Sequence, residues 1–235
     1  MRLSELLRDL QYTCLRGETD IEITGVAYDS RRVEEGSLFI CIRGAVSGGH
    51  AYAADAVRKG AAALVIQEEV EVPEGAAVIR VEDSRYALAL ISAAWFGYPA
   101  RKLKTIGVTG TKGKTTTTYM IQSILEAAGH KVGLIGTIEC ITGKRVLSAE
   151  NTTPESYLVQ EYFAEMVEAG CDCAVMEVSS QALMMHRVAG VTFDYGIFTN
   201  IEPDHIGPNE HGSFGEYLDC KRRLLRQCRV GMVNR

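Results

Sequence analysis

The chain has 235 residues, and at about 150 residues per domain this length corresponds to one and a half domains. Hydrophobic residues make up 46% and charged residues 23%, a globular mix that argues against intrinsic disorder. The net charge of −5 argues against a general nucleic-acid binder, and the lack of any apolar run near ~18 residues predicts no membrane insertion. The seven cysteines are scattered and lack zinc-finger spacing, which is typical of thiols in a reducing compartment, so we expect a cytoplasmic protein.

Short apolar runs alternate with helical stretches along the chain, which predicts an α/β fold. In the first part we expect strands at 21–27, 38–42, 62–66 and 77–81, and helices at 4–10, 52–59 and 84–96. The segment Gly97-Tyr98-Pro99-Ala100 then interrupts the pattern. It predicts a boundary between a small first α/β domain, residues 1–99, and a second domain, residues 100–235.

The second part begins a new series of elements. We expect strands at 104–109, 132–136, 173–178, 193–199 and 230–233, and helices at 114–128, 154–169 and 213–228. This alternation predicts a mostly parallel sheet with flanking helices. Because no helix follows the strand at 230–233, we expect this domain to be incomplete at its C-terminal end.

A glycine turn between a predicted strand and a predicted helix is the strongest chemical signal. The helix opens with Gly113-Lys114-Thr115, and glycines let a backbone wrap a phosphate whose charge the helix N-terminus favours. We expect Lys114 to neutralise β- and γ-phosphate charge and the Thr115 hydroxyl to face Mg²⁺. Val108 stands where the strict P-loop pattern has glycine. The alternative is a turn that only joins a strand to a helix.

Two ionisable residues sit where burial is expected. Glu177 ends an apolar strand, and ligand sites in open α/β sheets lie at the carboxyl ends of strands, so it is a candidate Mg²⁺ ligand or else a solvated acid. Lys221 interrupts the apolar stripe of the helix at 213–228. A lysine there either reaches out to water or is desolvated with a lowered pKa.

The loop Thr109-Gly-Thr-Lys-Gly-Lys-Thr-Thr116 resembles the ATP loop of the Mur ligases, the ATP-dependent amide ligases of peptidoglycan precursor synthesis. The resemblance implies that the loop residues bind ATP, namely Gly110, Thr111, Lys112, Gly113, Lys114, Thr115 and Thr116. The family usually has asparagine where this chain has Lys112. This departure adds a positive charge beside the phosphates and is not expected to abolish binding.

Three further segments resemble the metal-binding and lysine segments of the same family. Glu-Val-Ser-Ser at 177–180 implies that Glu177 binds Mg²⁺ together with Thr115, and Asp204-His205 implies that His205 helps to hold a second Mg²⁺. Asp204 is assigned no role. Lys221 aligns with a lysine that several members carry as a carbamate, formed from its neutral amine and CO₂. We therefore predict that Lys221 is carbamylated and positions the γ-phosphate.

Other segments resemble the family's contacts to its nucleotide-sugar substrate. In Val26–Arg31, Tyr28 and Ser30 match positions that contact uridine, and residues 45–47 match a second contact made through backbone. Matches to substrate positions nearer the reacting end are Asn151, Thr152, Thr153, Ser179 and Arg187. Met185 replaces a polar family residue and is not assigned. The plain alternative for 150–154 is a helix cap with Thr153 before Pro154, and capping is compatible with substrate contact.

The motif order is most similar to that of the UDP-N-acetylmuramoyl-tripeptide synthetases. This implies a monomeric ligase that uses ATP and two Mg²⁺ to join UDP-MurNAc-L-Ala-D-Glu, through an acyl phosphate, to a diamino acid, either meso-diaminopimelate or L-lysine. In such ligases a C-terminal domain reads the amino acid, and the chain shows none. We therefore expect these 235 residues to bind the UDP-sugar but to ligate poorly or not at all.

Three alternatives stay open at this point. One is a relative such as folylpolyglutamate synthase or the synthetase that adds D-Ala-D-Ala, against which the Asn-Thr-Thr and Asp-Ser-Arg segments argue. A second is a P-loop kinase or a GTPase, although no guanine-reading Asn-Lys-x-Asp is present. The third is a non-catalytic protein that binds a UDP-sugar or ATP.

Overall fold

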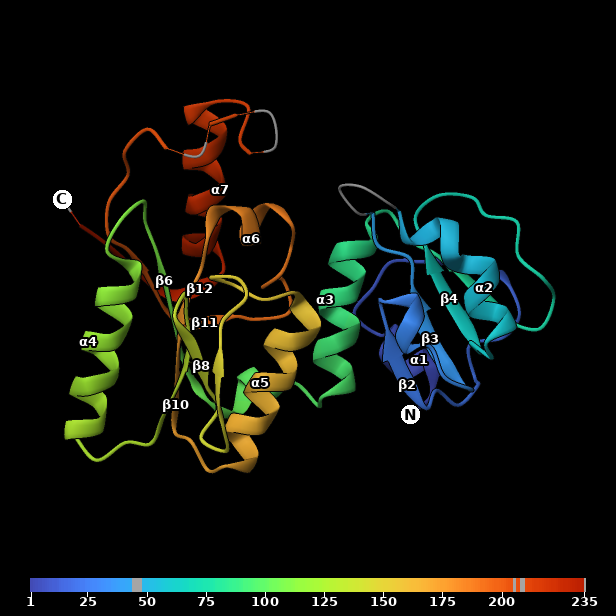
Figure 1. Ribbon diagram of the computed structural model, residues 1–235, viewed down its shortest axis with the longest axis horizontal. Helices are drawn as coiled ribbons and strands as arrows, with labels where there is room; N and C mark the ends of the chain where they lie inside the picture. The colour runs from blue at the N-terminus through green and yellow to red at the C-terminus, as the bar shows by residue number, and fades with distance from the viewer. Residues whose placement is uncertain (44–47, 205, 208–209, 235) are drawn as a thin grey trace. The chain divides into compact units, whose positions relative to one another are not determined.

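The computed structural model describes residues 1–43, 48–204, 206–207 and 210–234. The chain forms two compact units, Met1–Trp95 and Phe96–Arg235 (Figure 1). Within the described ranges, no helix is both long enough and apolar enough to cross a membrane. All seven cysteines are free thiols, and five of them are buried.

The first unit is built on a five-stranded sheet with the strand order β1-β5-β4-β3-β2. The strands are β1 Thr13–Arg16, β2 Gly25–Ala27, β3 Ser37–Ile40, β4 Ala63–Ile66 and β5 Ala77–Arg80, and all neighbours are parallel except β1 and β5. Strands β3 and β4 are buried along their whole length, as expected of central parallel strands. The helices are α1 Leu3–Leu6, α2 Ala53–Arg58 and α3 Ser84–Trp95, with 3₁₀ turns at Ser30–Arg32 and Gly49–Tyr52.

The second unit has a seven-stranded sheet with the order β12-β11-β6-β10-β7-β8-β9. Its strands are β6 Lys104–Thr109, β7 Val132–Ile135, β8 Glu139–Ile141, β9 Val146–Ser148, β10 Cys173–Glu177, β11 Phe193–Phe198 and β12 Cys228–Val233. The pairs from β12 to β7 are parallel, and β8 and β9 add an antiparallel edge. The helices are α4 Lys114–Ala127, α5 Ser156–Glu168, α6 Ser180–Met184 and α7 Phe214–Arg226, after a 3₁₀ turn at Pro99–Lys102.

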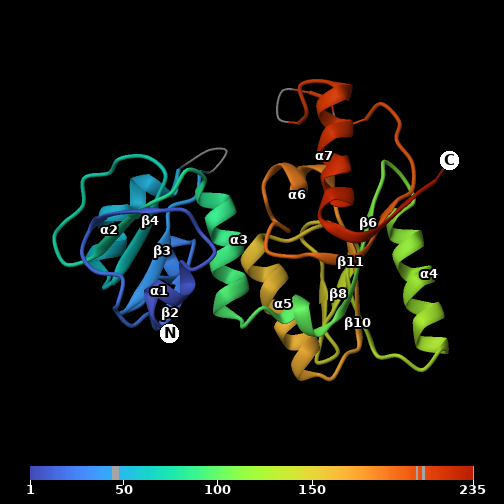
Figure 2. The ribbon, with the colours of Figure 1, turned by 180° about the vertical axis from the view of Figure 1, so that it is seen from behind.

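Helices cover both faces of this second sheet, and β10 shows why. Its alternate residues Cys173 and Val175 belong to one apolar cluster with Tyr119 and Leu125 of α4, while Ala174 and Met176 belong to a cluster with residues of α5, α6 and α7. Figures 1 and 2 show α4 on one side of the sheet and α5 and α7 on the other. The parallel strands therefore end together at one edge, where the loops that follow β6, β10 and β11 meet.

The predicted fold class is confirmed, and the predicted elements are found with shifted ends. The N-terminal helix ends at Leu6 instead of residue 10, and α5 begins at Ser156, two residues after Pro154. Four short elements were not expected: β1, β8, β9 and α6. β1 and β9 are edge strands, β8 lies between β7 and β9, and α6 is a single short helix. None of the four carries a long apolar repeat that the sequence would reveal.

Candidate nucleotide and substrate site

The loop at residues 109–116, called the phosphate loop below, joins β6 to α4, and two glycines determine its conformation. Gly110 has φ +154°, and a Cβ built on it would lie 2.0 Å from Thr199 Oγ1. Gly113, at φ +78°, is the N-cap residue of α4 in the left-handed conformation. The backbone N–H groups of the first turn of α4 therefore follow directly after the glycine turn. This is the arrangement in which a helix N-terminus binds a phosphate.

Asn200 and Glu202, which follow β11, hold this loop in place by hydrogen bonds and an ion pair. The carbonyl and side-chain oxygens of Asn200 each lie 3.1 Å from the Thr111 amide nitrogen, and the same side chain accepts from the Lys112 amide at 3.0 Å. The Lys112 ammonium lies 2.6 Å from a carboxylate oxygen of Glu202. The extra positive charge at Lys112 is thus paired with an acid of the neighbouring segment, so its field at a bound phosphate is partly offset.

Two lysines converge on one carbonyl oxygen of the loop. Lys114 Nζ donates to Gly110 O at 3.0 Å and Lys221 Nζ donates to the same oxygen at 2.7 Å. Lys221 is 1% exposed, so it does not extend to water. Its pKa is lowered to about 7, chiefly by burial and also by the charge of Lys114, while the charge of Asp204 opposes the change. Burial also lowers the pKa of Lys114, against the charges of Glu177 and Asp204.

Glu177 is the last residue of β10 and is fully buried. Its carboxylate accepts hydrogen bonds from the Thr115 hydroxyl at 3.1 Å, from the Thr137 amide at 2.9 Å and from the Thr137 hydroxyl at 3.0 Å. A Cβ at Gly136 would lie 2.7 Å from the carboxylate, so glycine leaves room for it. One carboxylate and one hydroxyl fit Mg²⁺, which takes oxygen ligands and usually gains the rest from phosphates and water.

Thr153 has a different local role from the one its position before proline suggests. The N-cap of α5 is Glu155, whose side chain accepts from the Ser156 amide. The Thr153 hydroxyl is buried instead, donating to Glu177 O at 2.9 Å and accepting from the Ser179 amide at 3.1 Å. The capping interpretation of Thr153 is therefore wrong, and this residue joins the Asn-Thr-Thr segment to the end of β10.

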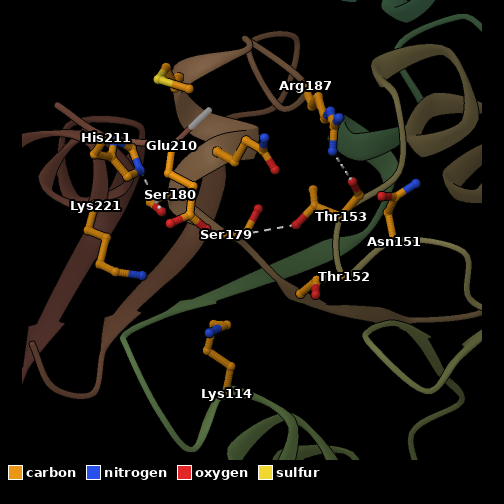
Figure 3. Close-up of a pocket in the computed structure, with 12 residues that line it drawn as sticks. Lys114, Asn151, Thr152, Thr153, Ser179, Ser180, Arg187, Glu210, His211 and Lys221 are labelled. Carbon is orange, nitrogen blue, oxygen red and sulfur yellow. Dashed lines mark hydrogen bonds between the residues drawn. The ribbon is translucent and has the colours of Figure 1, made fainter. Parts of the chain in front are cut away.

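One pocket of the second unit, about 170 Å³ in volume, brings together seven of the predicted site residues, from the phosphate loop, α7 and the two predicted substrate segments (Figure 3). It is lined by Lys114, Asn151, Thr152, Thr153, Ser179, Ser180, Gln181, Met184, Arg187, Glu210, His211 and Lys221. Arg187 is held there by a 2.9 Å bond from Nη1 to Thr153 O. The lining thus combines two lysines and an arginine with one carboxylate, Glu210, and with hydroxyl and amide groups, and its excess of basic groups suits an anionic, oxygen-rich ligand.

His211 and Ser180 are pocket residues to which the sequence assigned no role. His211 is 1% exposed, and its Nε2 lies 2.9 Å from the Ser180 hydroxyl oxygen. Figure 3 shows this pair on the same side of the pocket as Lys221. A single histidine in a loop carries no spacing signal, so only its burial in the fold reveals it.

The remaining predicted residues lie elsewhere. Tyr28 and Ser30 belong to the first unit, where Asp29 caps a 3₁₀ turn and its paired Arg31 lowers the pKa of Asp29 to about 2. A pocket of about 460 Å³ in that unit is lined by Gln11, Tyr12, Thr13, Gln67, Arg80, Val81 and Glu82, a set without either residue. His205 and residues 45–47 lie outside the described residues.

Comparison with known proteins tests the predicted resemblance. Residues 108–234 match the family described as "Mur ligase middle domain", and residues 22–96 match "Mur ligase family, catalytic domain". Two curated relatives bear the name UDP-N-acetylmuramoyl-L-alanyl-D-glutamate--2,6-diaminopimelate ligase. The protein of Clostridium perfringens (strain 13 / Type A) is 44% identical over 100% of this chain and 48% of its own length. The protein of Cytophaga hutchinsonii is 40% identical over 94% of this chain and 46% of its own length.

Solved structures agree on the fold. A structure of a ligase of the same name has a TM-score of 0.81 at 23% identity, with 100% of this chain and 47% of that chain covered. A MurF structure from Acinetobacter baumannii has a TM-score of 0.67 at 22% identity, with 99% and 48% covered. The chain thus spans about half the length of the curated relatives it matches. With the two family matches and this identity, the chain belongs to the Mur ligase family.

Proposed function

We propose that the chain supplies the ATP site and the UDP-MurNAc-L-Ala-D-Glu site of an ATP-dependent amide ligase in peptidoglycan precursor synthesis. The observation that carries the proposal is the shared pocket, which receives Lys114 from the phosphate loop, Lys221 from α7, and Asn151 and Arg187 from the two predicted substrate segments. A nucleotide phosphate and a substrate carboxylate can react only if they are held in one place. This pocket is where the two predicted sets meet.

The proposed reaction has two steps. The D-Glu carboxylate attacks the γ-phosphorus of ATP, the bond to the ADP oxygen breaks, and an acyl phosphate forms. The amine of a diamino acid then attacks the acyl carbon, inorganic phosphate leaves, and the amine loses a proton. The pocket volume of about 170 Å³ lies below the ~300–1,000 Å³ of whole-ligand pockets, so it suits the reacting end of the substrate and not the complete nucleotide-sugar.

In this scheme the lysines handle charge. Lys114 stabilises the charge that develops on the transferred phosphate, because it is held within the loop by bonds to Gly110 O and Thr111 O. Lys221 has the burial that keeps an amine neutral, and a neutral amine reacts with CO₂ to give a carbamate and one proton. A carbon-13 NMR signal of a carbamate in a sample equilibrated with labelled CO₂, absent after Lys221→Arg, would support this modification, whereas identical spectra would contradict it.

Mg²⁺ would be held by Glu177 and Thr115 together with ATP, and it would neutralise phosphate charge. These two side chains already lie 3.1 Å apart, oxygen to oxygen. Participation of His205 in a second Mg²⁺ site, and of Tyr28, Ser30 and residues 45–47 in uridine binding, stays a prediction. For the diamino acid we propose 2,6-diaminopimelate, because both curated relatives described above carry it in their names.

A binding experiment tests the proposal on this chain. Titration calorimetry with Mg–ATP and separately with UDP-MurNAc-L-Ala-D-Glu is expected to show binding of both. Arg187→Ala is expected to weaken UDP-MurNAc-L-Ala-D-Glu binding about tenfold or more, since a charged hydrogen bond is worth ~1.5–3 kcal/mol, and to leave ATP binding unchanged. Arg145→Ala is the matched control, because Arg145 pairs with Glu165 and does not line the pocket.

Turnover is tested on a chain extended to the length of the curated relatives. Phosphate release from ATP is expected only when UDP-MurNAc-L-Ala-D-Glu is present together with diaminopimelate. Release with L-lysine in place of diaminopimelate would reject the proposed diamino acid. In the binding experiment, the proposed substrate site would be rejected if Arg187→Ala did not weaken UDP-MurNAc-L-Ala-D-Glu binding, or if Arg145→Ala weakened it equally.

A further inference from the structure

Tyr217 of α7 occupies a central place beside the pocket. Its side chain is 0% exposed, and three groups of the site contact it from different directions. Its hydroxyl reaches the phosphate loop, its ring face meets Lys221, and its ring also meets His211. Ordinary core tyrosines bury a ring and satisfy one hydroxyl. This one touches three candidate site residues at once.

The hydroxyl of Tyr217 completes the hydrogen bonding of Thr111. Tyr217 OH lies 3.0 Å from Thr111 Oγ1, which also accepts from the Glu202 amide at 3.0 Å and donates to Glu202 O at 3.3 Å. A threonine hydroxyl has one proton to give and two lone pairs to fill, and these three bonds use all of them. Tyr217 is therefore the donor, and it fixes a loop residue 106 positions away in the chain.

The ring of Tyr217 supports the two other groups. Lys221 Nζ lies 4.6 Å from the ring centroid, as expected for residues four apart on one helix face. The His211 ring lies 5.2 Å from the Tyr217 ring, centroid to centroid, at an interplanar angle of 55°. Through its 2.9 Å contact with the Ser180 hydroxyl, His211 extends this packing to the pocket wall formed by α6.

We propose that Tyr217 is a positioning residue that serves both halves of the site: its hydroxyl fixes the phosphate loop through Thr111, and its ring fixes Ser180 on the pocket wall through His211. The inference rests on the proposed function, because it assigns the loop to a nucleotide and the wall to UDP-MurNAc-L-Ala-D-Glu. It predicts that a substitution at the Tyr217 hydroxyl weakens nucleotide binding alone, and that a substitution at His211 weakens binding of UDP-MurNAc-L-Ala-D-Glu alone.

The test measures two affinities, for Mg–ADP and for UDP-MurNAc-L-Ala-D-Glu, in each variant. Tyr217→Phe keeps the ring and removes the hydroxyl, so Mg–ADP binding is expected to weaken about three- to tenfold, the range for one net hydrogen bond, with the second affinity unchanged. His211→Leu is expected to give the reverse pattern, and His211→Gln, which can still bond Ser180, is expected to restore binding of UDP-MurNAc-L-Ala-D-Glu. Tyr217→Leu is expected to weaken both.

Two controls separate positioning from a general effect on folding. Tyr162→Phe makes the same chemical change on a half-buried tyrosine that packs against the core on α5, and it is expected to change neither affinity. In a Thr111→Val background, Tyr217→Phe is expected to cause no further loss, because the bond it removes is already gone. Thermal unfolding of each variant confirms that it is folded.

The outcomes distinguish the inference from the proposed function. If the unsubstituted chain binds neither ligand, both are overturned. If it binds both and Tyr217→Phe has unchanged Mg–ADP affinity, or weakens both affinities equally, Tyr217 does not position the loop and only the inference is overturned. If His211→Leu and His211→Gln weakened UDP-MurNAc-L-Ala-D-Glu binding equally, the proposed fixing of Ser180 through His211 would be overturned.

Discussion

Gly110 is a position where a single added methyl group is expected to disrupt the phosphate loop. A Cβ built there would lie 2.0 Å from Thr199 Oγ1 and 3.3 Å from both the amide nitrogen and the carbonyl oxygen of Asn200. Contacts under 3.0 Å are essentially never made by real Cβ atoms. In Gly110→Ala, either the Thr199 side chain must rotate away or the loop must shift from the segment that fastens it.

The cost follows from what is lost. The Thr199 hydroxyl lies 3.2 Å from both Thr109 O and Lys112 O, and because it has only one proton to donate, rotation would lose about one hydrogen bond, at about 0.5–1.5 kcal/mol. An alanine at φ +154° adds backbone strain of about 1–3 kcal/mol. We therefore expect Gly110→Ala to lower the free energy of unfolding by about 1.5–4.5 kcal/mol and to weaken Mg–ADP binding.

Urea unfolding of the chain measures this change, and Gly113→Ala is the matched control. Gly113 also has a positive φ, +78°, but a Cβ there would meet nothing within 4 Å, so only the strain of about 1–3 kcal/mol is expected. In a Thr199→Ala background the hydroxyl is already absent, and Gly110→Ala is expected to cost less by the same ~0.5–1.5 kcal/mol. Equal costs at Gly110 and Gly113, or full additivity with Thr199→Ala, would refute the reasoning.

Three further predictions concern charges and thiols. Glu177→Gln is expected to abolish the strengthening of ADP binding by Mg²⁺, a change of about tenfold or more (about 1.4 kcal/mol per tenfold), measured as the ratio of ADP affinities in Mg²⁺ and in a chelator; an unchanged ratio would contradict the metal assignment. Lys221 has a pKa of about 7 in the folded chain against 10.5 for an ordinary lysine, so between these pH values the unfolded chain binds the extra proton and stability rises with pH. Relative to Lys221→Met, the unfolding free energy of the unsubstituted chain is therefore expected to increase from pH 7 to pH 9, and parallel curves would count against it. Burial raises the pKa of Cys41 to about 12, so a thiol reagent is expected to label exposed Cys14 first and Cys41 only after unfolding, which mass spectrometry of the labelled peptides checks.

The phosphate loop shows what sequence alone can predict. Strand β6 and the first residue of α4 have the predicted positions, because local signals define them: an apolar run, glycines in the turn, and a lysine directly after Gly113. Lys221 could also be singled out from its own helix, because the spacing of the apolar residues shows that a lysine lies on the apolar face. Its burial confirms the desolvated alternative over extension to water.

Other parts of the site depend on contacts between distant segments and have no local signal. The Thr153 hydroxyl bonds residues 24 and 26 positions away, contacts that the sequence does not reveal, and the helix-cap alternative for Thr153 is incorrect. The Lys112–Glu202 pair spans 90 positions. The packing of His211 between Ser180 and Tyr217 likewise exists only after α6 and α7 come together.

The fastening of the phosphate loop has a consequence for protein engineering. Among the described residues, eight hydrogen bonds that involve a side chain join residues 109–116 to Thr199, Asn200 or Glu202, which follow β11. If residues 109–116 alone were transferred to another protein, the loop would lack these partners. It would then become ordered only when the ligand binds, which lowers the affinity. The transferable unit is therefore two segments on adjacent strands, 109–116 with 199–202, and an exchange between Mur ligases must carry both.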